Sequence, residues 1–468
     1  MELKKYDVLV IGSGISGLTS ALLFAKKGKK VAIAEQAANI APLISGFDRK
    51  SGGHNVHFET GFHYSAGFGE KEVGSLLLKE LGLEVPFEAC DENNYDEIHI
   101  LNSEKVFRVP FGKQKLEEKL AEFFPEEKKN IKAYLELVYE TVKNIPFLNK
   151  SPETLSREDL LTFFDDGKTL KEVLDKHFKS EELKELFSYA YILHGTPPSK
   201  VSFALHCSCT GLMADSVWKI KGGAQTLINA YAGALKKYNI DTFTKKKAVK
   251  IEVEKGEKKV YFEDGTEIGC DICVSSIHPK ELIKIAPGNI YRKNGAERIE
   301  KIEETPSFFA LYGVLPEKEK YNCTNMAFMG GAEKEGFSGE SPAYINFSDT
   351  DPQAVCVVAF VKPDEVFWDR KESGYKERKR ALADKIKAET QKLCPEIAAK
   401  IQYCDSASPA TYKSYVNYFG GYGIMHDAAD VKILPATKVP GIFLTGQAVV
   451  TPGLLGALIS SFLLDKLI

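Results

Sequence analysis

The chain has 468 residues, of which 44% are hydrophobic and 27% are charged, as in an ordinary globular protein. Its length exceeds what one hydrophobic core usually supports, so we expect two structural domains. The formal net charge of -3 gives no electrostatic reason for nucleic acid as a partner, and we expect none.

The nine cysteines show no spacing typical of a disulfide framework, so we expect reduced thiols in a cytoplasmic protein. Cys270 and Cys273 form a CxxC pattern, but no second pair accompanies them and we predict no metal site. The uncharged stretch 439–464 is long enough to cross a bilayer, yet its prolines and glycines favour a strand, a glycine turn and a buried helix. We therefore predict no membrane span.

Residues 6–35 have the pattern of a dinucleotide-binding unit. An apolar run predicts a strand buried on both faces, a GxGxxG follows, and a helix-period segment and second apolar run then lead to an acid. Gly12 permits the tight turn, Gly14 lets the backbone approach a pyrophosphate at the helix N-terminus, and Gly17 allows close helix–strand packing. Glu35 is spaced to accept hydrogen bonds from the adenosine ribose.

A second strand-to-helix junction near the C-terminus favours FAD over NAD. Residues 442–445 predict a short apolar strand, Gly446 and Gln447 follow it, and Gly453 opens an apolar helix. The backbone N–H groups of this junction suit an acceptor such as a flavin carbonyl or a ribityl-phosphate oxygen. The predicted cofactor is non-covalent FAD, with the binding residues Gly12, Gly14, Ile15, Ser16, Gly17, Glu35, Gln36, Gly446, Gln447, Gly453, Leu454 and Gly456.

Several segments resemble the FAD-dependent amine oxidase superfamily, and within it the group of phytoene desaturases, retinol saturases and carotenoid isomerases. The likeness covers the whole chain. It is carried by the unit at 6–35, FETGFHYSAG at 58–67, the stretch 193–227 ending in Gly-Gly before a helix, SPATYKSYVNYFGGYG at 408–423, and LTGQ at 444–447.

The resemblance implies an α/β protein in which a Rossmann-type, glutathione-reductase-like FAD-binding domain is interleaved with an α+β substrate domain. The expected FAD-binding domain comprises 1–90, 215–280 and 435–468, and the substrate domain comprises 91–214 and 281–434. The resemblance also implies that the Val249 backbone contacts the adenine. The family's Gly-Gly pair followed by arginine is displaced here, with Arg49 before Gly52-Gly53, so the arginine that meets the pyrophosphate is left open.

The implied reaction is saturation or desaturation of a C=C bond in a hydrophobic, isoprenoid or polyene-like molecule. His63 and Tyr64 are the acid–base candidates because the matching family segment lies near the flavin; the alternative is that they only hydrogen-bond their loop. The predicted substrate-binding residues are Tyr415, Tyr418, Tyr422 and His206, for which ordinary aromatic packing and a core histidine are the alternatives.

Two other functions share this fold. A carotenoid-type cis–trans isomerase would use reduced FAD without net redox change, and a non-enzymatic prenyl-protein escort would tend to lose the flavin site. Only one dinucleotide unit is recognisable, so we expect an electron partner other than NAD(P)H. We also expect peripheral contact with a membrane surface, because such a substrate partitions into lipid.

Overall fold

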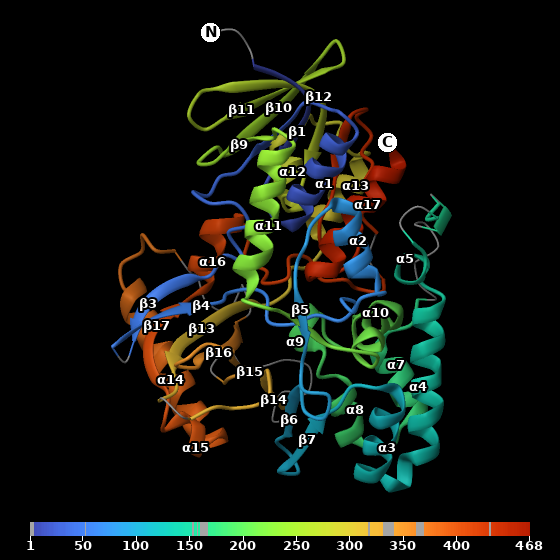
Figure 1. The fold of residues 1–468 in the computed structure, drawn as a ribbon, viewed down its shortest axis with the longest axis vertical. Coiled ribbons are helices and arrows are strands. Elements are labelled where there is room, and N and C mark those ends of the chain that lie inside the picture. Colours follow the sequence, from blue (N-terminus) through green and yellow to red (C-terminus); the bar gives the residue numbers. More distant parts are fainter. Residues whose placement is uncertain are drawn as a thin grey trace.

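The computed structural model describes residues 4–51, 53–151, 154–156, 158–159, 167–316, 319–330, 341–361, 369–429 and 432–468. The described chain forms two seven-stranded sheets and a group of helices (Figure 1). The first sheet lies beside the N-terminus, the second lies below it, and the helices from α3 to α10 lie next to the second sheet. This is the predicted α/β class.

The first sheet is built around parallel strands from distant parts of the chain. β1 pairs in parallel with β2 and β12, and β18 extends the sheet beyond β12. From Val8 to Ile11, β1 is apolar and buried on both faces, because helices cover the sheet. The strands of the first sheet, in spatial order, are β10 (Ala248–Glu254), β11 (Glu257–Phe262), β12 (Glu267–Ser275), β1 (Lys4–Ile11), β2 (Val31–Ala34) and β9 (Asp241–Phe243). β18 (Ile442–Leu444) pairs with β12.

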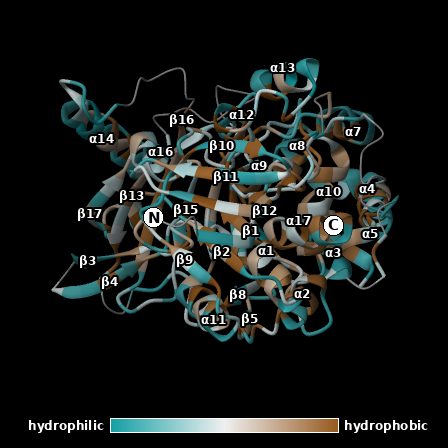
Figure 2. Ribbon diagram, turned by 90° about the horizontal axis from the view of Figure 1, so that it is seen from above, coloured by the Kyte–Doolittle hydropathy of each residue, from teal (hydrophilic) through white to brown (hydrophobic). Residues whose placement is uncertain are grey.

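Two apolar helices pack together against this sheet. α1 (Ile15–Lys26) follows β1, and α17 (Leu454–Leu467) follows β18. Ser461 Oγ donates to the backbone oxygen of Ser16 at 2.8 Å, which joins the middle of α17 to the first turn of α1. Hydrophobic residues gather around them in Figure 2, whereas the outer helices α13 (Lys293–Lys301) and α14 (Tyr375–Leu393) are hydrophilic. Across the described ranges, no helix is long and apolar enough to cross a membrane.

The second sheet is mixed, and its central strands are fully buried. The apolar runs predicted as strands near 307–314, 343–347 and 355–361 form three of its strands. α14, α15 (Pro395–Ala398) and α16 (Pro409–Val416) follow these strands along the chain. Its strands, in order, are β17 (Gln402–Ala407), β13 (Ser307–Val314), β16 (Ala354–Val361), β15 (Tyr344–Phe347), β14 (Asn325–Met329), β6 (Asp96–Ile100) and β7 (Lys105–Val109).

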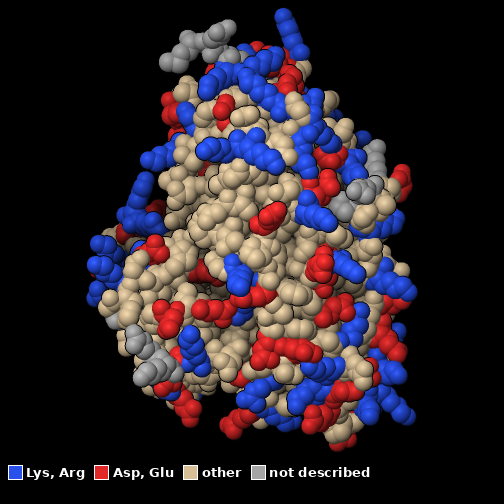
Figure 3. Space-filling model, in the orientation of Figure 1, with Lys and Arg blue, Asp and Glu red and all other residues tan. Residues whose placement is uncertain are grey.

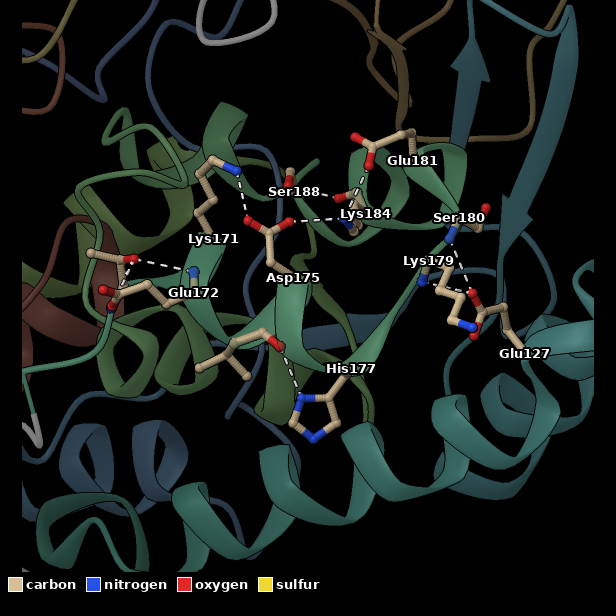
Figure 4. A network of polar contacts seen from close by, with 12 residues as sticks. Glu127, Lys171, Glu172, Asp175, His177, Lys179, Ser180, Glu181, Lys184 and Ser188 are labelled. Carbon is tan, nitrogen blue, oxygen red and sulfur yellow. Dashed lines mark hydrogen bonds and ion pairs between the residues drawn. The ribbon is translucent and has the colours of Figure 1, made fainter.

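Polar contacts fix the helices beside the second sheet (Figure 4). The carboxylate of Glu127 accepts from the backbone N–H groups of Lys179 at 2.9 Å and Ser180 at 3.0 Å, where α8 begins. Asp175 binds Lys171 and Lys184. The helices are α3 (Lys113–Phe123), η1 (Pro125–Glu127), α4 (Lys128–Lys143), α5 (Pro146–Asn149), α7 (Leu170–His177), α8 (Glu181–Phe187), α9 (Tyr191–His194) and α10 (Phe203–Met213).

The remaining elements connect these parts. The hairpin of β3 (Phe47–Ser51) and β4 (His54–Phe58) packs on the second sheet, because Arg49 Nε donates to Asp405 Oδ2 of β17 at 2.7 Å. The domain boundaries stay a prediction. The other elements are α2 (Val73–Leu81), β5 (Phe87–Ala89), β8 (Trp218–Ile220), α11 (Ala224–Lys237) and α12 (Pro279–Ile285).

Candidate functional site

The junction between β1 and α1 leaves open space at the helix N-terminus. Gly12 has a φ of +94°, which favours glycine, and a Cβ on Gly17 would lie 2.1 Å from the Gly12 carbonyl oxygen. Gly14 differs from both, because a Cβ there would meet no protein atom within 4 Å. Ile15 and Ser16 form the first turn of α1 behind it, and both are buried. The space beside Gly14 therefore suits a pyrophosphate.

The junction between β18 and α17 repeats this geometry. Gly446 and Gly453 have φ values of +113° and +96°, and a Cβ on Gly453 would meet no atom within 4 Å. A Cβ on Gly456 would lie 2.1 Å from the Thr451 carbonyl oxygen, the same approach that Gly17 makes to Gly12. Leu454 forms the first residue of α17. Residues 451–456 thus copy the spacing of GxGxxG with threonine in the first place, a likeness that the sequence reading missed.

Glu35 is buried at the end of β2 and ties the first junction together. Its Oε2 accepts from the backbone N–H of Ser13 at 2.8 Å and from the Ser13 hydroxyl at 2.7 Å, and its Oε1 accepts from Ala37 N at 2.7 Å. A carboxylate has about four acceptor positions, so one remains for a ribose hydroxyl. Ribose binding by Glu35 stays a prediction.

Val249 lies at an irregularity of the first sheet. The register between β10 and β11 shifts between Ala248 and Lys250, which leaves Val249 without a ladder partner and 41% exposed. The backbone N–H of Lys246, just before β10, donates to the Glu35 carbonyl oxygen at 2.8 Å. Val249 is therefore a bulged, partly exposed residue three positions after the one that bonds Glu35, and its adenine contact stays a prediction.

The side chains of Gln36 and Arg49 are engaged with the substrate-side elements. Gln36 Nε2 donates to the Tyr415 carbonyl oxygen, and Gln36 Oε1 accepts from Asn417 Nδ2 at 2.8 Å. Arg49 is paired with Asp405, as described above. Both side chains therefore already have protein partners in this arrangement. The backbone at the N-termini of α1 and α17 is the better candidate for binding the phosphates.

Four distant segments meet at the C-terminal junction. Gln447 Nε2 donates to the Tyr418 hydroxyl at 3.4 Å, and a Cβ on Gly423 would lie 2.8 Å from the same nitrogen. A Cβ on Gly67, in the FETGFHYSAG segment, would lie 3.0 Å from Leu455 Cδ2. Cys209 of α10 contacts Thr451 through its sulfur at 3.8 Å. Three of the segments that carry the family resemblance thus surround the β18–α17 loop.

His63 and Tyr64 have different surroundings although they are neighbours in sequence. Burial, helped by the charge of Lys219, lowers the pKa of His63 to about 4, so its imidazole is neutral at pH 7. Within the described residues, His63 makes no hydrogen bond to protein. Tyr64 donates its hydroxyl proton to Asp96 Oδ2, and burial followed by the nearby Asp96 raises the pKa of Tyr64 well above its usual value.

Asp96 is a fully buried carboxyl that sequence reasoning missed. It begins β6 and accepts from Tyr64 and from the backbone N–H of Asn325, the latter at 3.0 Å. Burial raises the pKa of Asp96 to about 8, although these hydrogen bonds oppose the change. No local pattern marks it, because Glu97 and His99 stand beside it in β6. At pH 7 the buried Asp96 carboxyl is therefore mostly protonated. Its proton can exchange with that of the Tyr64 hydroxyl through their hydrogen bond.

The raised pKa of Asp96 predicts a pH dependence of stability. The folded carboxyl binds its proton more tightly than the unfolded one, so this group's contribution to the unfolding free energy falls as pH rises from about 4 to about 8. Asp96→Asn should remove this decrease, which we would measure from urea unfolding at pH 5, 6, 7 and 8. Glu97→Gln is the control, because the pKa of Glu97 is lowered and its contribution changes only at lower pH than the range measured. Parallel curves for wild type and Asp96→Asn would contradict this account.

A narrow apolar cavity lies between the helices and β6. It encloses about 60 Å³ of free space, room for about two water molecules, so a longer ligand requires the lining side chains to move apart. No charged side chain of the described chain lines it. At one end the hydroxyls of Tyr95 and Tyr189 are 2.7 Å apart, and the Tyr95 ring packs against the Tyr64 ring. The lining also includes His206, Thr210 and Ala214 of the 193–227 segment.

The predicted aromatic wall does not line this cavity. Tyr415 is 45% exposed on α16. Tyr418 packs on the His278 ring, with centroids 4.2 Å apart. Tyr422 donates its hydroxyl to the Ile192 carbonyl oxygen and packs edge-on against Phe308. The three tyrosines therefore face different environments, and of the predicted substrate residues only His206 borders the cavity.

The two junctions and the two sheets define a flavoprotein with a Rossmann-like cofactor domain and a substrate domain. A family model of flavin-containing amine oxidoreductases matches residues 15–460, and the chain belongs to this family. The cofactor is accordingly FAD, and the protein is an FAD-dependent oxidoreductase.

Known proteins agree with this assignment over the full length. The chain is 25% identical to all-trans-retinol 13,14-reductase of Rattus norvegicus over 537 residues, covering 99% of this chain and 86% of that protein. An oxidoreductase from Methanosarcina mazei has a TM-score of 0.69 at 13% identity, with 98% of both chains covered. Cyclohexylamine oxidase from Brevibacterium oxydans has a TM-score of 0.63 at 15% identity, covering 99% and 98%. A fatty acid isomerase from P. acnes has a TM-score of 0.62 at 11% identity, covering 98% and 97%.

Proposed function

We propose that the protein saturates or desaturates a C=C bond of a hydrophobic, isoprenoid or polyene-like molecule. The observation that carries this proposal is the uncharged cavity beside the half-buried Tyr64 and its buried partner Asp96. An amine substrate would bring a cation into a cavity without a carboxylate on its described walls, which is costly. The distant full-length similarity to a retinol reductase supports the same reaction type.

FAD supplies hydride chemistry when it is bound, and the chain has to manage the proton. Reduction of a C=C bond needs a hydride at one carbon and a proton at its neighbour, and desaturation reverses both transfers. In this proposal Tyr64 donates or accepts that proton, and Asp96 holds the hydroxyl in place and replaces its proton. His63 stays neutral and orients the substrate or the cofactor. The backbone at Gly14 and Gly453 would hold the phosphates and ribityl oxygens of FAD.

Product analysis tests this proposal directly. The photoreduced protein is incubated anaerobically with all-trans-retinol or a related polyene, and the products are separated by mass. We expect a product that is two hydrogens heavier, and about a 100-fold slower reaction for Tyr64→Phe, since a lost general acid typically costs 10²–10⁴-fold. The control is Tyr231→Phe, another buried tyrosine, which hydrogen-bonds Thr19 at 2.6 Å in the FAD domain. Equal rates for Tyr64→Phe and Tyr231→Phe would refute the role of Tyr64.

A second candidate is isomerisation of a C=C bond without net redox change. The structural likeness to a fatty acid isomerase favours keeping it. The same experiment separates the two, because isomerisation leaves the product mass unchanged. A prenyl-protein escort is the third candidate, and a purified protein without flavin absorbance would favour it.

A further inference from the structure

Three histidines from separate segments, each with a buried ring nitrogen, converge between the cavity and the C-terminal junction. His194 ends α9 and His206 lies on α10; each is 1% exposed, and their ring centroids are 5.9 Å apart at an interplanar angle of 82°. His426 follows the 408–423 segment, and its backbone N–H donates to Thr196 Oγ1 at 3.1 Å. Because the Thr196 N–H in turn donates to His194 Nδ1, these bonds bring the His426 backbone next to the end of α9.

Each of these histidines has a ring nitrogen without a hydrogen-bond partner in the described chain. The unpartnered atoms are His194 Nε2, His206 Nδ1 and His426 Nε2. Buried polar atoms are almost always paired in proteins, so three orphan nitrogens in one place indicate a missing ligand.

The other ring nitrogens identify the tautomers. His194 Nδ1 accepts from the backbone N–H of Thr196 at 3.2 Å, so the proton of a neutral His194 is on Nε2. A neutral imidazole has one donor and one acceptor nitrogen, and the unpartnered Nε2 of His426 can serve as the acceptor. The cluster therefore offers one unpaired donor, His194 Nε2–H, and His426 Nε2 to accept a hydrogen bond.

The cluster is uncharged. Burial lowers the pKa of His206 to about 3 and that of His426 to about 4, and burial with the two neighbouring rings lowers the pKa of His194 well below its usual value. No ion pair of the described chain involves these three side chains. Neither a carboxylate nor an ammonium group would find a compensating charge here.

Its position connects the cavity to the cofactor side. His206 lines the apolar cavity, whereas His426 lies three residues after Gly423, where a Cβ would be 2.8 Å from Gln447 Nε2 of the β18–α17 junction. A molecule that fills the cavity toward the junction would thus bring a polar end group to the histidines.

We propose that His194, His206 and His426 form a specificity site that binds one uncharged hydroxyl group of a hydrophobic ligand. The hydroxyl oxygen accepts a hydrogen bond from His194 Nε2–H, and the hydroxyl donates a hydrogen bond to His426 Nε2. His206 closes the site on the cavity side. Ammonium and carboxylate end groups are excluded. The assignment rests on the proposed function for the location of the substrate, but it concerns binding and not the chemical step.

Ligands of equal chain length test the site. The FAD-loaded protein at pH 7.5 is titrated with 1-decanol, decylamine and decanoate, and binding is followed by calorimetry and by the change in flavin absorbance. We expect 1-decanol to bind at least about 10-fold more tightly than the two charged ligands. His194→Leu and His426→Leu should each weaken 1-decanol binding about 10-fold and reduce the preference, since a site with buried polar groups loses discrimination when they are removed.

Folding and cofactor loading are checked on the same variants. His194→Leu also removes the acceptor of the buried Thr196 N–H, so its melting temperature should fall modestly, whereas FAD content should be unchanged in both variants. The control is His57→Leu on the surface hairpin, where His57 pairs with Asp48, and it should bind all three ligands like the wild type. Leucine variants that keep the 1-decanol preference, or that purify without FAD, would overturn the assignment. Absence of C=C chemistry with the preference intact would refute the proposed function and leave this site standing.

Discussion

Gly14→Val is expected to give a folded protein that no longer holds FAD. The position has a φ of −60° and a ψ of 169°, a conformation that valine adopts readily, and a side chain there would meet no protein atom within 4 Å. The new methyl groups would instead occupy the space beside the first N–H groups of α1, where the pyrophosphate would bind. We expect flavin occupancy to fall at least roughly 10-fold, a loss of about 1.4 kcal/mol or more in binding free energy.

The first measurement is the ratio of flavin absorbance, at about 450 nm for an oxidised flavin, to protein absorbance. The second is the melting temperature of protein stripped of FAD. Gly233→Val is the matched control: Gly233 lies in α11, is exposed and has no atom within 4 Å of an added Cβ. It should keep the flavin. Stripped wild type and stripped Gly14→Val should melt alike. A fully yellow Gly14→Val protein would place the cofactor elsewhere.

Patterns of short range predicted the cofactor half of the fold well. The strand, glycine turn and helix of residues 4–26 are adjacent in sequence, and each residue's role depends on near neighbours. The same holds for the strand and helix around Gly453. The repeated spacing at 451–456 escaped notice because threonine stands where the first glycine of GxGxxG would be.

The substrate half was harder to predict because its site depends on contacts between distant segments. The aromatic residues 415–422 are dense in sequence, but α16 and the following loop turn their rings toward different neighbours, and Tyr415 toward solvent. Asp96 has no local motif, since its pKa is raised by burial that only the assembled sheet provides. The pairing of His206 with His194 likewise joins two helices through tertiary packing.

Charges on the surface add little to the assignment of partners. On the face drawn in Figure 3, basic and acidic side chains are interspersed around a central uncharged area. This arrangement does not favour a polyanion as a ligand of that face, in line with the net charge of -3. The class of electron partner therefore has to be inferred from whether the chain has a second dinucleotide-binding unit.

NADPH is expected to leave the FAD of this protein oxidised, whereas dithionite should bleach it within minutes. Two-domain flavoenzymes that use pyridine nucleotides carry a second dinucleotide unit, and the other glycine pairs here have different roles. Gly222-Gly223 precede α11, but the backbone N–H of Ala224 already donates to the Glu59 carboxylate at 2.8 Å, so that helix N-terminus is occupied. At Gly421 a Cβ would lie 2.3 Å from the Phe308 ring. Gly330-Gly331 reach beyond the described residues.

The experiment compares anaerobic flavin spectra after addition of excess NADPH, excess NADH, a quinol or dithionite. We expect bleaching by dithionite and by the quinol, because a flavin without a nicotinamide site exchanges electrons through its exposed edge with small or apolar partners. Glu59→Gln is an informative variant: it removes the charge that occupies the α11 N-terminus but restores no strand or ribose acid beside it, so NADPH should still leave the flavin oxidised. Rapid bleaching of the wild type by NADPH with saturation kinetics would demonstrate a nicotinamide site outside the two junctions, and the α11 N-terminus would then be the first place to search.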